Sequence, residues 1–292
     1  MYSQIDSNKR KSVLLLMLAA ALVMAIGYIF DRAYGGDGYG GLFLGIIISL
    51  ITTSVSYFQG DKIALWTAGA QPTTKEDNRY AYNLVENLCI TAGLPVPKIY
   101  IISDSAINAF ATGRKPELAS IAITTGAIEK LKNEELEGVI AHELSHIQNY
   151  DIRFMMLIAV LVGAISIMAN IFLHGGMFRR RGNRENDGLA IFAIIGIVLA
   201  ILSPIIAELI KLAVSRKREY LADASGALLT RYPEGLASAL EKIKNENQPL
   251  AQASPATAPM YFSNPFSRKN FSALFSTHPP LDDRIKKLRR MA

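Results

Sequence analysis

Residues 133–149 have the sequence NEELEGVIAHELSHIQN, which predicts one helix with an acidic first turn. Asn133 is a good N-cap residue, and the glutamates that follow it interact favourably with the helix dipole. His142 and His146 are four residues apart, so they lie one above the other on the same helix face. Two imidazoles in this arrangement can bind one zinc ion, and Glu143 stands beside them, where a carboxylate can take a proton from a metal-bound water. The stretch therefore predicts a zinc site with an adjacent base.

The third zinc ligand must come from outside this helix, because a zinc hydrolase needs three protein ligands and one open position. Glu208 and Glu219 are the downstream candidates, whereas His174 ends an apolar run and is better explained as an interfacial residue. Glu219 is favoured, since Asp223 follows four residues later on the same helix face. From there its carboxylate can orient a ligating histidine.

Apolar runs on both sides of this helix are long enough to cross a bilayer, which takes about 20 residues. They cover residues 13–30, 40–58, 154–174 and 189–209. Lys9, Arg10 and Lys11 precede the first run and predict a cytoplasmic N-terminus, so the second crossing returns the chain to the cytoplasm near residue 61. The connector between the third and fourth runs holds four arginines. The positive-inside rule disfavours placing this connector outside the cell, so it stays open whether the second pair of runs fully crosses the membrane. The predicted parts are a membrane hairpin at 1–60, a cytoplasmic part at 61–153, a second apolar hairpin at 154–210 and a cytoplasmic part at 211–292.

Composition agrees with a membrane protein and excludes several other classes. The 292 residues are 50% hydrophobic and only 19% charged, with a mean hydropathy of +0.22, whereas soluble domains carry about 25% charge. The net charge of +6 does not indicate nucleic-acid binding, because many basic residues flank apolar runs and no recognisable nucleic-acid motif occurs. Cys89 is the single cysteine, so an intramolecular disulfide and a multi-cysteine metal site are both excluded.

The polar parts of the sequence predict helices around a small sheet. Hydrophobic periodicity and turn residues predict helices at 75–94, 133–149, 211–230, 235–245 and 281–291, strands at 98–102, 108–112 and 119–125, and a proline-rich loop at 247–270. An extended peptide is expected to bind by adding to the edge of strand 119–125, although the neighbouring strand at 108–112 is nearly as well explained as plain sheet. The candidate substrate contacts are Asn108, Ala109, Phe110, Ile121 and Ile123.

The ordered set of motifs resembles the HtpX family of integral-membrane zinc endopeptidases. The set comprises HELSH at 142–146, SRKREYLAD at 215–223, NAFA at 108–111, MYFSNPF at 260–266 and THPP at 277–280. The resemblance covers nearly the whole chain and implies a mainly α fold: a polytopic membrane protein with four apolar helices and a cytoplasmic gluzincin-like α+β zinc protease domain containing a small sheet. It implies one zinc ion per chain held by His142, His146 and Glu219, with Glu143 as general base, Asp223 behind a ligating histidine, and His278 as the candidate that stabilises the oxyanion.

The resemblance also implies a biological role. Family members cleave damaged or misfolded membrane proteins, so the expected function is proteolytic quality control in the cytoplasmic membrane of a bacterium, with the catalytic domain facing the cytoplasm. A processing protease of the CAAX-prenyl-protease type with narrow specificity is an alternative that uses the same metal site. A non-catalytic zinc-binding membrane scaffold is another, and Glu143 argues against it because a pure binding site has no use for that base.

Overall fold

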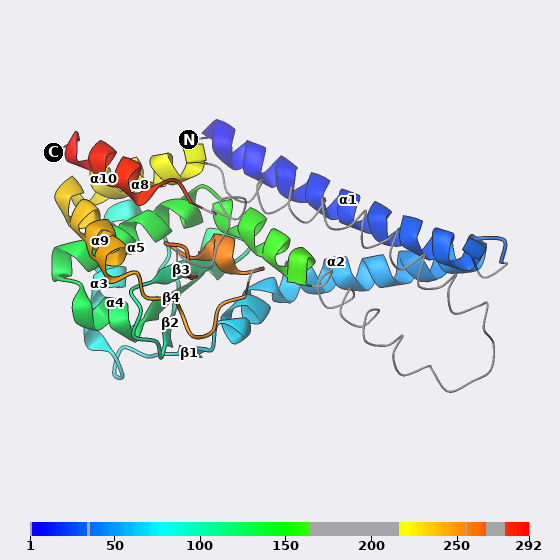
Figure 1. Cartoon of the computed structure of the whole chain (residues 1–292), viewed down its shortest axis with the longest axis horizontal. Helices are drawn as coiled ribbons and strands as arrows, with labels where there is room; N and C mark the ends of the chain where they lie inside the picture. The colour runs from blue at the N-terminus through cyan, green and yellow to red at the C-terminus, as the bar shows by residue number, and fades with distance from the viewer. Residues whose placement is uncertain (1, 34–35, 164–215, 255, 267–277, 292) are drawn as a thin grey trace.

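The computed structural model describes residues 2–33, 36–163, 216–254, 256–266 and 278–291. A pair of long helices projects from a domain in which shorter helices surround a small sheet (Figure 1). Most of the third predicted apolar run and all of the fourth lie outside the described residues, as do His174 and Glu208. The prediction of four apolar helices therefore stays a prediction for the second pair.

The long helices are α1 (Tyr2–Ala33) and α2 (Tyr39–Thr67), and they form the predicted first hairpin. Within the described residues these two helices are long and apolar enough to cross a membrane, and only 11% and 17% of their most apolar windows are buried. The helices approach closely through small residues, as is common between helices in lipid. A Cβ atom on Gly41 of α2 would lie 2.0 Å from the carbonyl oxygen of Gly27 on α1.

Both helices are longer than a bilayer requires, and their ends nearest the domain pack onto it. At 1.5 Å per residue, the 29 residues of α2 exceed the roughly 20 needed to span. Gly60, Ala64 and Leu65 near the end of α2 are buried, and Leu15 of α1 belongs to the same apolar cluster as Ala64 and Leu65. The hairpin is therefore continuous with the core of the domain.

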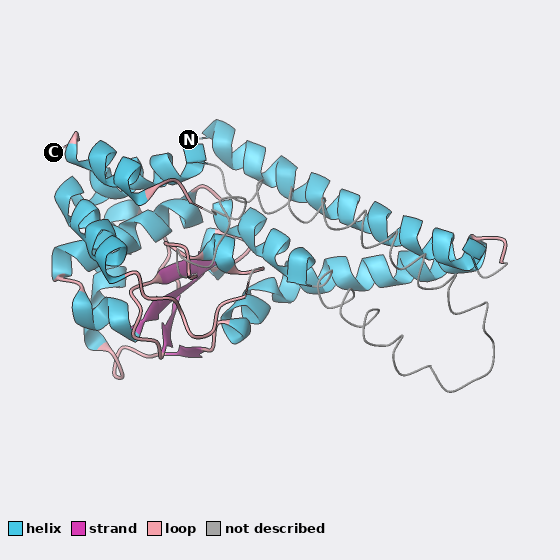
Figure 2. Ribbon diagram, in the orientation of Figure 1, coloured by secondary structure: helices cyan, strands magenta, loops and turns pink. Residues whose placement is uncertain are grey.

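The sheet has four strands in the order β1-β2-β4-β3 (Figure 2). They are β1 (Ala70–Pro72), β2 (Lys98–Ile102), β3 (Ala109–Thr112) and β4 (Ser120–Thr124). The three predicted strands are confirmed, and β1 is an addition of three residues that pairs antiparallel with β2. The expected peptide addition at 119–125 is wrong, because β4 is parallel to β2 on one side and antiparallel to β3 on the other. Neither edge of β4 is open, and the edge strands are β1 and β3.

Helix α5 is the centre of the domain. The helices are α3 (Arg79–Ala92), α4 (Thr125–Lys130), α5 (Asn133–Gln148), α8 (Arg216–Thr230), α9 (Pro233–Glu246) and α10 (Leu281–Arg289), with short 3-10 turns at Pro116–Leu118 and Ala258–Met260 and a further helical stretch at 151–163. Twelve of the 16 residues of α5 are buried, and α3, α8, α9 and β3 all pack against it. The helix that carries the histidines is thus enclosed on most sides.

The start of α5 differs from the prediction in one respect. Lys132, not Asn133, is the N-cap, and its backbone N–H donates to the Glu135 carboxylate at 2.6 Å. A glutamate at this position that accepts from the N-cap N–H forms one half of a capping box, and the Lys132 side chain has no acceptor to form the other half. The Asn133 amide donates instead to Glu137 at 2.8 Å.

Candidate metal centre and active site

His142 and His146 lie one turn apart on the buried face of α5. Their Nε2 atoms are 3.1 Å apart, and the residues are 0% and 4% exposed. Glu219 reaches both from the first turn of α8: its Oε2 lies 3.7 Å from His142 Nε2, and its Oε1 lies 3.5 Å from His146 Nε2. Ligand atoms of all three residues lie within 4.8 Å of one another. The structure therefore brings the three predicted zinc ligands together.

Close packing of α8 on α5 places Glu219 in reach. Gly226 lies where the two helices meet, and a Cβ atom on it would stand 3.0 Å from the backbone nitrogen of His142. With no side chain there, α8 lies directly against the turn that carries the first histidine. Glu219 and Asp223, which precede Gly226 on the same helix, are both buried as a result.

A carboxylate stands behind each histidine. Asp223 Oδ1 lies 2.9 Å from His142 Nδ1, which is the placement the sequence predicts. Asp151 Oδ2 lies 3.0 Å from His146 Nδ1, and the sequence analysis does not anticipate that contact. Each carboxylate accepts the Nδ1 proton, so Nε2 is the nitrogen left to bind a metal.

The residues of this cluster fit a zinc ion. Two nitrogen ligands on a tetrahedral zinc stand about 3.3 Å apart, given Zn–N bonds of about 2.0–2.1 Å, and the two Nε2 atoms are 3.1 Å apart. Glu219 Oε2 is buried and has no hydrogen-bond partner among the described residues. Burial lowers the pKa of His146, but Asp151 and Glu219 outweigh it and raise that pKa to about 9. The surroundings thus favour positive charge at this point.

Glu143 is held beside the cluster by the sheet. It is 1% exposed, and its carboxylate accepts a hydrogen bond from the backbone N–H of Ala111 in β3. Before any metal charge is added, burial raises the pKa of Glu143 to about 8. A base works best when its pKa lies near the working pH, so this carboxylate can both accept and release a proton.

Arg284 is a site residue that the sequence analysis missed. It lies on α10 and is 0% exposed, and it donates to both oxygens of Asp223, from Nη2 at 2.7 Å and from Nε at 2.9 Å. Its Nη1 is 3.8 Å from Glu219 Oε2. Burial alone would raise the pKa of Asp223, but the guanidinium outweighs it and holds that pKa well below its usual range. Asp223 therefore stays ionised behind His142.

A sequence signal for Arg284 does exist. On a helix, residues spaced i, i+3, i+4 and i+7 share one face, and Arg284 stands on the apolar face of α10 with Leu281, Ile285 and Leu288. An arginine on such a face is expected to find a buried acidic partner. Asp151 gives no comparable signal, because it lies just beyond the end of α5.

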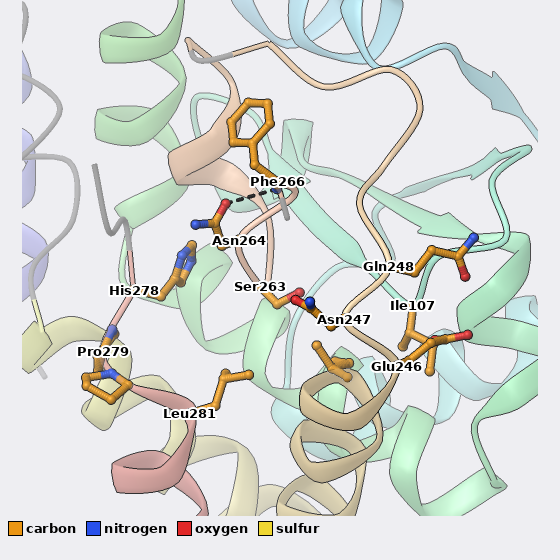
Figure 3. A pocket seen from close by; sticks show the side chains of 12 residues that line it. Ile107, Glu246, Asn247, Gln248, Ser263, Asn264, Phe266, His278, Pro279 and Leu281 are labelled. Atoms are coloured by element: carbon orange, nitrogen blue, oxygen red, sulfur yellow. Dashed lines mark hydrogen bonds between the residues drawn. The ribbon is translucent and has the colours of Figure 1, made fainter. Parts of the chain in front are cut away.

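His278 stands close to the cluster. Its Nε2 is 4.0 Å from Glu219 Oε2, and burial lowers its pKa to about 4, so the ring is neutral at pH 7. It also lines a cavity of about 160 Å³, which Figure 3 shows beside it together with Ser263, Asn264 and Leu281. His278 therefore stands between this cavity and the metal-ligand cluster.

The predicted substrate contacts have mixed outcomes. Ile121 and Ile123 are 0% exposed inside the sheet, so a peptide has no access to them. Asn108 precedes β3 and Ala109 is its first residue, and both are buried. They pair with another part of the chain: Phe262 N–H donates to Ala109 O at 2.8 Å, and the Asn108 amide donates to Ser263 O at 3.1 Å. Phe110, next in the strand, is also buried. Substrate binding by Asn108, Ala109 and Phe110 stays a prediction.

The two halves of the molecule together define its class. Two helices that are long and apolar enough to cross a membrane project from a domain that carries a metal-ligand cluster beside a buried carboxylate base. This combination is typical of a membrane-bound metal-dependent hydrolase.

Comparisons with known proteins give its family. The sequence pattern described as "Peptidase family M48" matches residues 75–292. The chain is 44% identical to "Protease HtpX homolog" of Caldanaerobacter subterraneus subsp. tengcongensis, over 100% of this chain and 98% of that one. It is also 44% identical to the protein of the same name from Dictyoglomus turgidum, over 99% and 94%. The chain belongs to peptidase family M48, and the resemblance to the HtpX proteins is confirmed.

A solved structure shares the fold. The "Crystal Structure of S. mikatae Ste24p" superposes with a TM-score of 0.52 at 18% sequence identity, covering 99% of this chain and 67% of that chain. At this level of identity the similarity concerns the fold alone.

Proposed function

We propose that this chain is a zinc endopeptidase of a bacterial cytoplasmic membrane that hydrolyses damaged or misfolded membrane proteins. The observation that carries the proposal is Glu143, a buried carboxylate next to a cluster that fits zinc, with its position fixed by the backbone of β3. A site that only stored zinc would not need this group. The names of the relatives, which are proteases, support the same activity.

His142, His146 and Glu219 would hold the zinc ion. When bound, zinc supplies Lewis acidity: it lowers the pKa of water and polarises the scissile carbonyl. Glu143 accepts a proton from the attacking water on its carboxylate and then delivers it to the nitrogen of the leaving amine. The Ala111 N–H keeps that carboxylate from rotating away between the two transfers.

His278 is proposed to stabilise the oxyanion. Because its pKa is lowered to about 4, the ring is neutral at working pH and keeps one N–H. A neutral imidazole can donate that N–H to the oxygen on which negative charge develops. Its place beside Glu219 puts it at the rim of the metal cluster.

The proposed topology follows from charge. Lys9, Arg10 and Lys11 lie at the domain end of α1, and this end is cytoplasmic by the positive-inside rule. Residues 61–153 and 211–292 then form one cytoplasmic catalytic domain, with 154–210 as a second hairpin. Packing of α8 and α9 onto α5, and of α10 onto α8 and α9, supports a single domain built from both parts. A site at the end of a membrane hairpin suits substrates that are themselves in the membrane.

The test compares the parent protein, purified in detergent, with Glu143→Gln and with Glu134→Gln as the matched control. Glu134 is an exposed carboxylate on the same helix. We expect about one zinc per chain in all three proteins and casein cleavage by the parent and the control only, with Glu143→Gln slower by about 10²–10⁴-fold. Cleavage that survives in Glu143→Gln, or folded parent protein without zinc, would refute the proposal. For the substrate class, a destabilised membrane protein in the same bilayer should be cleaved and its stable parent spared.

A further inference from the structure

The carboxylate of Asp151 is shared between the metal cluster and the membrane helix α1. Its Oδ2 faces His146 Nδ1 at 3.0 Å, and its Oδ1 accepts a hydrogen bond from Asn8 Nδ2 at 2.7 Å. Asn8 is 3% exposed and Asp151 is 2% exposed. A continuous, buried path of two hydrogen bonds therefore joins the cytoplasmic end of α1 to a zinc ligand.

The turn after α5 is what aims Asp151 back at the histidine. Tyr150 adopts a φ of 59°, a left-handed conformation that is uncommon for a residue other than glycine. The chain reverses there, and the next helix begins with Asp151. Asn8 fixes this turn as well, because the same amide donates to the backbone oxygen of Asn149 at 2.9 Å. The Lys9 ammonium lies 4.6 Å from the centre of the Tyr150 ring. Helix α1 therefore holds the turn at adjacent points.

One face of α1 is buried where the helix meets the domain, and it carries two polar residues. Asn8, Ser12 and Leu15 are spaced by four and three residues, share one face and are all at most 5% exposed. Polar side chains are rarely buried on an apolar membrane helix unless they have partners. Asn8 finds its partners in the domain, and Ser12 donates to Asn8 O at 2.8 Å.

Asn8 is the close hydrogen-bond donor to Asp151 Oδ1. Arg218 forms an ion pair with the same oxygen, but its Nη1 stands 3.7 Å away, which is beyond hydrogen-bond distance. The short hydrogen bond to Oδ1 therefore comes from an amide of the membrane helix. This contrasts with Asp223, which is held by a charged arginine within the domain.

We propose that Asn8 and Asp151 are positioning residues of the zinc site. Asn8 orients the Asp151 carboxylate, and Asp151 accepts the Nδ1 proton of His146, so that the ring presents Nε2 to the metal. The affinity for zinc then depends on the seating of α1 against the domain. This inference rests on the proposed zinc function and adds to it a requirement for the membrane hairpin.

The test exchanges the two side chains. In Asp151→Asn only one side-chain oxygen remains to accept from both the Asn8 amide and His146 Nδ1. In Asn8→Asp two carboxylates face each other. The double variant Asn8→Asp/Asp151→Asn restores a donor and an acceptor in reversed order, with an oxygen still facing His146 Nδ1. Asp6→Asn is the matched control, because Asp6 is an exposed carboxylate on the same turn of α1.

The readout is zinc affinity, measured by competition with a chromogenic chelator on full-length protein in detergent. We expect each single variant to bind zinc about 10–100-fold more weakly and Asp6→Asn to match the parent. The double variant should recover part of the loss, because the carboxylate introduced by Asn8→Asp cannot replace the hydrogen bond from the Asn8 amide to Asn149 O. Recovery of zinc affinity in the double variant would show that the two side chains act through their hydrogen bond, because exchanging them would not reverse a loss caused by packing alone. Asn8→Ala, which removes the donor without adding charge, keeps the test open if Asn8→Asp does not fold, and should weaken binding by about tenfold.

Two outcomes would overturn the inference while leaving the proposed function intact. One is a parent that binds zinc and an Asn8→Ala variant that binds it equally tightly. The other is a double variant whose loss equals the sum of the two single losses, since independent effects add. A parent that binds no zinc would instead count against the proposed function itself.

Discussion

Replacement of Arg284 by methionine should destabilise the protein more than any exposed charge change on the same helix. The arginine is fully buried and makes a bidentate pair with Asp223. Without it, a carboxylate that is only 3% exposed keeps a single close partner, His142 Nδ1. Removing one member of a buried ion pair costs about 3–5 kcal/mol, because the other charge is left uncompensated.

The expected change in thermal unfolding follows from that cost. For a domain of this size, 1 kcal/mol shifts the midpoint by about 2–4 °C, so Arg284→Met should unfold about 6–20 °C below the parent. Arg289→Met is the matched control on α10: its pairs with Glu234 and Glu241 are exposed and are worth at most about 1 kcal/mol. Unfolding is followed by circular dichroism of the purified protein in detergent.

A double-mutant cycle isolates the pair. Asp223→Asn removes the negative charge but keeps an oxygen that can accept the His142 Nδ1 proton. When it is combined with Arg284→Met, no buried charge is left unpaired, so the combined loss should be smaller than the sum of the single losses by about 0.5–3 kcal/mol. Two results would show that the ion pair does not support the site in the way its geometry indicates. One is an unfolding midpoint of Arg284→Met equal to that of Arg289→Met, and the other is a double variant whose loss of stability equals the sum of the losses of Arg284→Met and Asp223→Asn.

Three further predictions concern packing and reactivity. Gly226→Ala places a Cβ atom 3.0 Å from the backbone of α5 beside the first histidine and should weaken zinc binding by about tenfold. The control is Gly138→Ala, whose Cβ atom would lie 2.8 Å from the backbone of α9. It should cost about 1–3 kcal/mol of stability and leave zinc affinity unchanged. Gly41→Ala, 2.0 Å from a carbonyl of α1, should lower the melting temperature in detergent, whereas Gly40→Ala, 3.7 Å from its nearest neighbour, should not; equal midpoints would contradict the close packing of the hairpin. Burial raises the pKa of Cys89 to about 11, so alkylation at pH 8 should be about 10²-fold slower in the folded protein than in the unfolded one, and equal rates measured by mass spectrometry would show an open core.

Local patterns predicted the centre of the site, because the relevant spacing lies within single helices. His142, His146 and Glu143 sit on one helix, and Asp223 stands one turn beyond Glu219 on another. The approach of the second helix to the first is not local, so the choice of Glu219 over Glu208 had to rest on the chemistry of the ligand set.

Errors in the sequence interpretation arose where contacts are made between distant segments. Strand 119–125 looks like any apolar strand, and only the pairing of β4 with both β2 and β3 shows that it has no free edge. Arg284 acts through a partner 61 residues away, and Asp151 is held by Asn8, which is 143 residues away. The apolar face of α10 carried a signal for the arginine, whereas the turn at Tyr150 carried none for the aspartate.

The two histidines are supported in physically different ways, and this difference has a consequence. Asp223 behind His142 is fixed by a guanidinium within the domain, through two short hydrogen bonds that also carry charge. Asp151 behind His146 accepts one hydrogen bond at Oδ1 from a neutral amide on a membrane helix, and the Arg218 guanidinium stands 3.7 Å from the same oxygen. Asp223 instead has a bidentate pair with a guanidinium, which adds geometric specificity as well as energy. The His146 side is therefore the weaker of the two supports. A disturbance of the hairpin should reach the metal there first, while His142 keeps its orientation, so loss of membrane seating should weaken zinc binding before the domain unfolds.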